Sequence, residues 1–192
     1  MYSQNGEEEH ILANTGPTGH FLDIGAYDGK TFSNTLALVE RGWSGVCVEP
    51  SPECFSALQK LHHDNQKITL VNALLGFQWQ LRKFYNSPEA NATSEQGNYD
   101  RWKGVSKFRE IFLSELPIFE FLKIHPGPYD FMNIDTEGTS WRVLQSIVQD
   151  IPLANLVCVE YDSFGDQVEL FFKNLGYIIV YKSGENIIAR KS

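Results

Sequence analysis

The chain has 192 residues, of which 24 are acidic and 16 are basic, so its formal net charge at neutral pH is −8. A protein that binds nucleic acid needs clustered Lys and Arg side chains to neutralise phosphates, so this balance argues against a nucleic-acid partner. With 42% hydrophobic and 21% charged residues, the composition is that of a folded chain rather than a disordered one. Because domains typically run to about 100–200 residues, we expect residues 1–192 to form a single domain.

The sequence carries no signal for membranes or secretion. No apolar run approaches the ~18–20 residues that a membrane-spanning helix requires. The first residues, MYSQNGEEEH, are acidic where a signal peptide would be basic and then apolar. The three cysteines form no CxxC pair, which argues against a disulfide framework or a thiolate zinc site. We therefore expect a cytoplasmic protein without a membrane partner.

Short β-rich runs alternate with helical patterns along the chain. Apolar runs predict five buried strands, at residues 20–25, 45–50, 68–76, 129–135 and 155–162. Apolar residues at helical spacing follow the first, second, fourth and fifth of these runs, and the first such helix is expected to start near Phe32. The next helix is expected to begin with Ser51 as its N-cap and Pro52 at its first position.

Three further segments complete the expected elements. Residues 177–182 and 186–191, joined by Ser-Gly-Glu, predict an antiparallel hairpin. Residues 108–116 are expected to form a helix that Pro117 breaks or kinks. The polar segment 86–105 has no apolar period and, at about twenty residues, exceeds the usual connection in a compact domain, so it predicts a lid, a binding loop or local disorder.

Strands that alternate with helices indicate an α/β fold, in which a doubly wound, mostly parallel sheet is covered by helices on both faces. The closing hairpin adds an antiparallel strand. In such a sheet, ligands bind beyond the carboxyl ends of the strands, near the point where the strand order reverses. We expect that edge to carry residues 25–29, 49–51, 72–74, 135–138 and 160–162.

The sequence DIGAYDG ends the first strand and opens the following helix. Because Gly25 has no Cβ, a ligand can approach the backbone there, and Gly29 eases the turn into the helix. The N–H groups at a helix start suit an anionic group. Glu49 ends the second strand about twenty residues later, where a carboxylate can accept hydrogen bonds from both ribose hydroxyls of a nucleoside. The pair predicts a nucleoside-containing cofactor with an anionic end.

The same turn discriminates between cofactors. A dinucleotide site needs the spacing G-x-G-x-x-G, and Tyr27 stands where the second glycine belongs. Asp28 would also add negative charge beside a pyrophosphate, so NAD is disfavoured. S-adenosylmethionine has a ribose, an adenine and an amino-acid end but no phosphate, and it is compatible with the acidic turn.

Five segments in this order resemble the FkbM-type family of class I S-adenosylmethionine-dependent methyltransferases: YSQNGEEEHIL, DIGAYDG, VEPSP, VNALLG and DFMNIDTEG. The similarity covers roughly residues 2–162, and the predicted hairpin suits the seven-stranded, Rossmann-like sheet of that class. The resemblance implies methyl transfer, usually to an oxygen of a sugar, polyketide or similar small molecule. The chain departs from the family at Asn133, where lysine is frequent, and over residues 86–105, which align with nothing in it.

The resemblance also implies where the cofactor lies. It places the methionine moiety near Asp23, the ribose on Glu49, and the adenine between residues 50–51 and 72–73, with Gln4 reaching the amino-acid end. The full set of expected cofactor-binding residues is Gln4, Asp23, Gly25, Ala26, Tyr27, Gly29, Glu49, Pro50, Ser51, Asn72 and Ala73.

A hydroxyl acceptor must also lose its proton, either to a general base or through a metal ion. Asp135 ends the fourth strand beside the expected methyl group and Glu137 follows it, so these two are the expected catalytic residues. Asp135, Glu160 and Asp162, at neighbouring strand ends, could instead bind Mg²⁺, which prefers oxygen ligands, or cap the next helices. The metal is the less favoured of these interpretations.

The sequence thus predicts an S-adenosylmethionine-dependent O-methyltransferase that acts on a hydroxyl of a small molecule or a glycan. Two alternatives stay open. A non-catalytic S-adenosylmethionine-binding sensor or partner subunit is one, because the chain has almost no dedicated substrate region. An NAD-dependent oxidoreductase is the other, although the glycine spacing argues against it. Trp102 and Tyr99 in the polar segment are candidates for stacking on a substrate or for plain packing. Nothing in the sequence fixes the oligomeric state.

Overall fold

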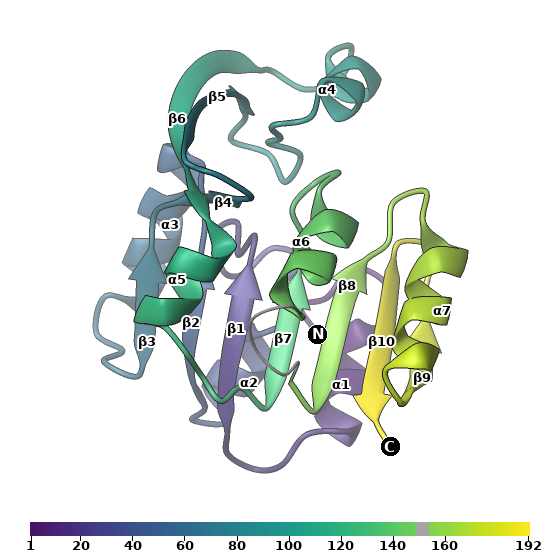
Figure 1. Ribbon diagram of the computed structural model, residues 1–192. Coiled ribbons are helices and arrows are strands. Elements are labelled where there is room, and N and C mark those ends of the chain that lie inside the picture. Colours follow the sequence, from purple (N-terminus) through teal and green to yellow (C-terminus); the bar gives the residue numbers. More distant parts are fainter. Residues whose placement is uncertain (149–153) are drawn as a thin grey trace.

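The computed structural model describes residues 1–148 and 154–192. Its centre is a seven-stranded sheet with the strand order β3-β2-β1-β7-β8-β10-β9 (Figure 1). The strands are β1 (His20–Ile24), β2 (Ser44–Val48), β3 (Ile68–Val71), β7 (Phe131–Ile134), β8 (Leu156–Glu160), β9 (Tyr177–Lys182) and β10 (Asn186–Lys191). All neighbours pair in parallel except β10, which is antiparallel to both β8 and β9. The predicted α/β fold and the closing hairpin are therefore confirmed.

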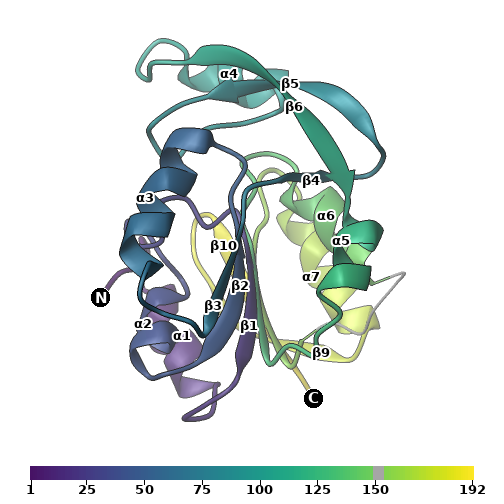
Figure 2. The same cartoon turned by 90° about the vertical axis from the view of Figure 1, so that its left-hand side faces the viewer.

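Helices cover both faces of this sheet, as Figure 2 shows with the sheet seen on edge. On one face lie α1 (Glu7–Ala13), α2 (Leu36–Glu40) and α3 (Pro52–His62), and on the other α5 (Ile118–Ile124), α6 (Ser140–Ile147) and α7 (Gly165–Asn174). Each layer buries its own apolar cluster: Leu58 of α3 packs with Phe21 and Phe131 on one side, and Leu144 of α6 packs with Leu22 on the other. Strands that are buried on both faces explain why their sequences are continuous apolar runs. Every helix among the described residues is too short or too polar to cross a membrane.

The local signals at two helix starts had different outcomes. Ser51 caps α3 as predicted: its Oγ accepts a hydrogen bond from the backbone N–H of Cys54 at 3.3 Å, and Pro52 is the first helical residue. The helix expected near Phe32 starts only at Leu36. Phe32 has a φ of 57° and is 50% exposed, so it belongs to the loop before α2 rather than to the buried face of a helix.

A second sheet lies beyond the carboxyl ends of the central strands (Figure 1). It has three strands in the order β4-β6-β5: β4 (Leu74–Gly76), β5 (Gln80–Asn86) and β6 (Arg109–Pro117). The run 68–76, predicted as a single strand, is divided at Asn72 and Ala73 between the two sheets. The divided run carries the chain from the central sheet to the small one.

The helix expected over residues 108–116 is wrong, because this segment is strand β6. Its side chains alternate: Glu110, Phe112 and Ser114 are exposed, whereas Glu115 and Pro117 are buried. This period of two fits a strand, and residues 109–115 of β6 pair with the whole of β5. The polar segment 86–105 is also more ordered than a plain loop, since it contains α4 (Gln96–Trp102).

Candidate functional site

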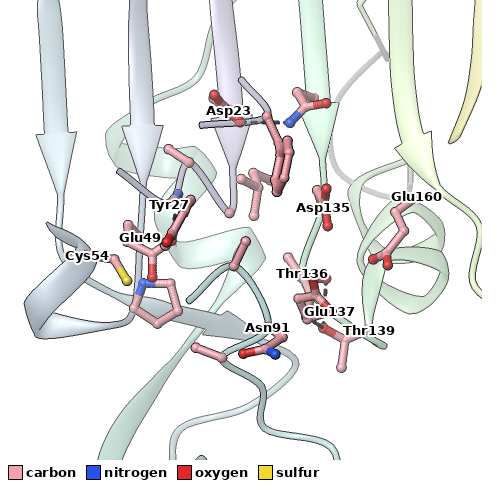
Figure 3. Close-up of a pocket in the computed structure, with 18 of the residues that line it drawn as sticks. Asp23, Tyr27, Glu49, Cys54, Asn91, Asp135, Thr136, Glu137, Thr139 and Glu160 are labelled. Carbon is pink, nitrogen blue, oxygen red and sulfur yellow. Dashed lines mark hydrogen bonds between the residues drawn. The ribbon is translucent and has the colours of Figure 1, made fainter. Parts of the chain in front are cut away.

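A pocket of about 440 Å³ lies between the carboxyl ends of the central strands and the small sheet. The turns after β1, β2, β7 and β8 form its floor, and residues from the segment 86–105 form its roof. Figure 3 shows Tyr27 and Glu49 on one side of this space and Asp135, Glu137 and Glu160 on the other. The pocket therefore lies at the edge of the sheet where the sequence predicts a ligand.

Most of the predicted cofactor residues line this pocket. Those that do are Gln4, Asp23, Gly25, Ala26, Tyr27, Glu49, Pro50 and Ala73. Three others lie outside the lining and support it. Gly29 packs against Leu58, where an added Cβ would lie 2.5 Å from a methyl carbon. The backbone N–H of Ser51 donates to Glu49 Oε1 at 2.7 Å, and Asn72 Nδ2 donates to the backbone oxygen of Glu49 at 2.7 Å.

Gly25 is required by the crossing of two strand ends. Its φ is +92°, a left-handed value that favours glycine, and a Cβ there would lie 1.6 Å from the backbone oxygen of Asp135. Any side chain at position 25 would separate the end of β1 from the end of β7. The glycine thus holds the turn after β1 directly against the Asp135 segment.

Glu49 is a buried carboxylate whose two oxygens are held by the backbone. It is 5% exposed, Oε2 accepts from the N–H of Tyr27 at 2.9 Å, and Oε1 accepts from the N–H of Ser51. Burial raises the pKa of Glu49 to about 8, against the effect of these hydrogen bonds. Each oxygen keeps a further lone pair, so the group can accept from two neighbouring hydroxyls.

Asp23 belongs to a buried network beneath the Gly25 turn. Its Oδ1 accepts from Asn133 Nδ2 at 2.9 Å and its Oδ2 from Thr35 Oγ1 at 2.6 Å. Asn133 Oδ1 in turn accepts from Asn34 Nδ2 at 3.0 Å. Desolvation raises the pKa of Asp23, and the two donors act in the opposite direction. Asn133 therefore places a neutral amide beside the buried Asp23 carboxyl group.

Three carboxylates meet on the far side of the pocket. Oxygens of Asp135, Glu137 and Glu160 lie within 4.8 Å of one another, a separation at which they could hold a metal ion. Ser140 Oγ donates to Glu160 Oε2 at 3.0 Å. Desolvation and the charge of Glu137 raise the pKa of Asp135 to about 8, while desolvation and Glu160 raise that of Glu137 to about 9. Asp162, the third residue of the metal interpretation, lines the pocket but lies outside this group.

Backbone strain is concentrated in the pocket wall. Among the described residues, four that are not glycine have a positive φ, and all four line the pocket: Tyr27, Phe32, Glu137 and Asp162. A left-handed conformation at such residues costs about 1–3 kcal/mol each and persists only where the surrounding structure imposes it. These four backbone conformations lower the stability of the fold, and they fix the shape of this pocket.

The segment 86–105 is tied to the floor on both sides of the pocket. Tyr27 Oη donates to the backbone oxygen of Pro88 at 2.8 Å, and Thr93 Oγ1 donates to that of Glu137 at 2.7 Å. Trp102 lines the pocket, as the substrate-stacking interpretation requires, whereas Tyr99 stacks on Tyr85 with ring centroids 4.1 Å apart. Sequence patterns gave no signal for the lining residues Asn34, Asn98 and Asn186, because each is placed by contacts distant in the chain.

Comparison with known proteins defines the class. A family model described as a methyltransferase FkbM domain matches residues 23–179. The chain therefore belongs to the FkbM methyltransferase family and is an S-adenosylmethionine-dependent methyltransferase of class I. No curated protein sequence matches it.

Solved structures support the fold at low sequence identity. A precorrin-6y C5,15-methyltransferase from Geobacter metallireducens is 13% identical with a TM-score of 0.53, over 97% of this chain and 86% of that one. A putative tRNA (m1A22) methyltransferase from Streptococcus pneumoniae, in complex with S-adenosyl-L-methionine, is 14% identical with a TM-score of 0.54. The match covers 100% of this chain and 74% of that one. TrmK from M. capricolum, in complex with S-adenosyl-homocysteine, is 10% identical with a TM-score of 0.52. The match covers 100% of this chain and 70% of that one.

Proposed function

We propose that the protein transfers a methyl group from S-adenosylmethionine to a hydroxyl of a small molecule or a glycan. The observation that carries this proposal is the division of one pocket into two chemically different sides. Glu49 and the turn after β1 line one side, and the half-buried Asp135, Glu137 and Glu160 line the other. The first side suits a nucleoside, and the second suits a group that must lose a proton.

The residues of the first side fit the cofactor. Glu49 is fixed by two backbone donors and offers free lone pairs to a ribose diol. Gly25 leaves backbone atoms open to the amino-acid end, with Gln4 beside it in the lining. Pro50 and Ala73 provide apolar contact for an adenine. Bound in this way, S-adenosylmethionine supplies a methyl group already activated on a sulfonium.

Asp135 and Glu137 provide the proton acceptor. A general base is most effective when its pKa lies near the working pH, and desolvation raises the pKa of Asp135 to about 8. The ionised carboxylate accepts the proton of the acceptor hydroxyl as the oxygen attacks. Glu137, whose pKa is raised to about 9, stays protonated beside it and can donate a hydrogen bond to the acceptor. Much of the remaining rate comes from alignment of the two reactants in the pocket.

The acceptor class rests on the site and on charge rather than on the neighbours, whose printed substrates range from precorrin to tRNA. A net charge of −8 and a pocket with several carboxylates disfavour a polyanionic acceptor. We further propose that residues 1–192 act as one cytoplasmic domain without bound Mg²⁺, the protons on the carboxylates taking the place of a metal ion.

Two measurements test this function. A ligand that binds only the native state stabilises it by RT ln(1 + [L]/Kd), about 2.7 kcal/mol at a hundredfold excess, so S-adenosylhomocysteine should raise the melting temperature clearly. Methyl-labelled S-adenosylmethionine, incubated with a library of hydroxyl compounds, should then yield a labelled ether. An unchanged melting temperature at millimolar S-adenosylhomocysteine would remove the cofactor assignment.

A further inference from the structure

Unpartnered oxygens are gathered around the pocket. Among the described residues, five buried side-chain polar atoms have no hydrogen-bond partner, and all five are oxygens. Four of them belong to residues that line the pocket: Asn34, Asn91, Asp162 and Asn186. A buried acceptor without a donor is rare in folded proteins, because its desolvation is not compensated. A ligand that carries N–H or O–H donors would satisfy these unpaired acceptors.

Asn186 is the most informative of the four. It is 6% exposed, and its Nδ2 donates to Glu7 Oε1 at 3.1 Å, which leaves Oδ1 as the unpaired atom. Its backbone pairs in register with Glu160 at the end of β8. Because β10 is antiparallel to β8, the start of β10 and the end of β8 lie at the same edge of the sheet. The unpaired oxygen thus belongs to the same end of the pocket as the carboxylates.

Acidic side chains outnumber basic ones at this end, where Arg101 lies close enough to Asp162 and Glu137 to act on the pKa of both in the lowering direction. Glu160 and Asp162 after β8 and Glu185 before β10 line it together with Glu137. Among the described residues that line the pocket, Arg101 is the one with a cationic side chain. An anionic ligand would meet repulsion here, and a neutral polyol would supply donors but no countercharge. A protonated amine supplies both, because its charge lowers the pKa of the neighbouring carboxyl groups and they ionise beside it.

The strand order places the β8–β10 end away from the part of the pocket that is proposed to bind the ribose. Glu49 follows β2, and β10 stands four strands further along the order β2-β1-β7-β8-β10. At about 4.8 Å for each strand, four steps correspond to ~19 Å. The proposed sites for the ribose and for the methionine moiety near Asp23 are at β2 and β1. Gln4, proposed to reach the amino-acid end, precedes Asn5, whose Nδ2 donates to Glu185 Oε2 at 3.1 Å. The amino-acid end therefore borders the β8–β10 end, and the rest of that end is left for the acceptor.

We propose that the β8–β10 end of the pocket, formed by Asn186, Glu160 and Asp162, binds a protonated amine of the methyl acceptor. The acceptor is then a compound that carries an ammonium group close to the hydroxyl that is methylated. This inference rests on the proposed function. The ammonium group donates to Asn186 Oδ1 and to the carboxylates of β8, and the neighbouring hydroxyl lies at Asp135.

The test uses two small probes that differ in one group. Ethanolamine carries a protonated amine next to a hydroxyl, and ethylene glycol carries a second hydroxyl instead. Each is titrated by calorimetry into the protein saturated with S-adenosylhomocysteine. Since a hydrogen bond to a charged group is worth roughly tenfold or more in affinity, we expect ethanolamine to bind at least about tenfold more tightly. Asn186→Ala and Glu160→Gln should each remove most of this preference.

Asn86→Ala is the matched control. Asn86 is 3% exposed, its Oδ1 is also unpaired and its Nδ2 donates to Glu53, but it does not line the pocket. Its replacement should leave the preference for ethanolamine unchanged.

Three results would overturn the inference: equal affinity for the two probes, binding of neither, or a preference that Asn186→Ala and Glu160→Gln leave intact. Mg²⁺ that binds these residues and excludes ethanolamine would also overturn it and define a metal site. Loss of S-adenosylhomocysteine binding is a separate outcome, which would remove the proposed function. In that case the same titrations of the ligand-free protein still decide the amine preference.

Discussion

Glu49 combines a structural role with the proposed binding role at one carboxylate. Its oxygens accept from the N–H groups of Tyr27 and Ser51, so its loss frees two buried donors as well as the ribose contacts. We predict that Glu49→Ala weakens S-adenosylhomocysteine binding at least about tenfold, since it removes both hydrogen bonds to the ribose, each worth roughly 1 kcal/mol. Calorimetry on the folded variant measures this. Glu89→Ala, on the roof of the same pocket, is the control and should bind normally. Unchanged affinity in Glu49→Ala would mean that the ribose lies elsewhere.

Asp135 tests the chemistry rather than the binding. Asp135→Asn keeps the shape of the side chain but removes the proton acceptor, and loss of a positioned base typically costs about 10²–10⁴-fold in rate. We predict this loss in turnover with little change in the dissociation constant of S-adenosylhomocysteine, because the interaction acts mainly in the transition state. Normal turnover would exclude the base. Activity that EDTA abolishes and Mg²⁺ restores would instead assign Asp135 to a metal site with Glu137 and Glu160.

At the scale of residues, the sequence predicts those parts of the site that follow a strand directly. Gly25, Glu49 and Asp135 each end an apolar run, so the edge of the sheet to which they belong can be inferred. Asn34 and Asn186 could not be found in this way. Asn34 bonds to Asn133, 99 positions away, and Asn186 to Glu7, 179 positions away. No local pattern encodes contacts of that range.

At the scale of elements, the segment 86–105 is a roof fastened at particular atoms. Thr93 is fully buried, its Oγ1 donates to the backbone oxygen of Glu137, and its backbone pairs with Tyr85. We predict that Thr93→Val, which keeps the shape and removes the hydroxyl, speeds amide hydrogen exchange over residues 87–102 by roughly fivefold. The basis is the ~1 kcal/mol that a hydrogen bond contributes to holding a segment closed.

Thr15→Val is the matched control for this change. Thr15 Oγ1 donates to the backbone oxygen of Ile11, far from the pocket lining. Its loss should leave exchange over residues 87–102 as in the unsubstituted protein. Equal exchange in Thr93→Val and Thr15→Val would show that other contacts hold the roof.

Elements of the central sheet could be predicted from sequence because both of their faces are buried, which makes their apolar runs continuous. Strand β6 of the small sheet could not. In β6 the apolar Phe112 faces solvent at 61% exposure, while the charged Glu115 is 2% exposed and accepts from the N–H of Phe77 at 2.7 Å. Hydrophobicity alone therefore misassigns the faces of β6. Its pairing with β5 is fixed by the ladder of backbone hydrogen bonds, which the side-chain pattern does not encode.

At the scale of the whole molecule, the buried carboxyl groups tie stability to pH. The pKa is raised to about 8 for Glu49 and Asp135 and to about 9 for Glu137, mainly by desolvation. In the unfolded chain these groups ionise near pH 4, so between pH 4 and 9 the folded state binds more protons. Stability then falls as pH rises, by about 1.4 kcal/mol per pH unit for each proton of difference. These groups make their full contribution to the free energy of unfolding below pH 4, and the contribution is lost as pH rises through their folded pKa values.

Carboxyl groups with lowered pKa act in the opposite direction but weakly. Glu53, Asp100 and Glu169 are held ionised by hydrogen bonds and nearby cations, and they lie at the surface, where solvent screens the effect. They oppose the buried groups only near pH 4. Burial also lowers the pKa of His20 and His62, which opposes the pocket carboxyl groups only up to about pH 7, since free histidine is neutral above that.

We predict that the ligand-free protein melts at a lower temperature at pH 9 than at pH 6, with the decline spread over that range. Glu137→Gln is neutral at every pH and keeps the shape of the side chain. This variant should match the unsubstituted protein near pH 4 and become progressively the more stable of the two as pH rises to 9, by up to a few kcal/mol. Thermal melts at half-unit steps measure both effects. Glu9→Gln, an exposed substitution on α1, should follow the unsubstituted curve. A melting temperature that stays level from pH 6 to 9 would mean that these carboxyl groups ionise near pH 4 in the folded protein, as they do in the unfolded chain. Desolvation would then not raise the pKa of Asp135, the proton acceptor of the proposed reaction.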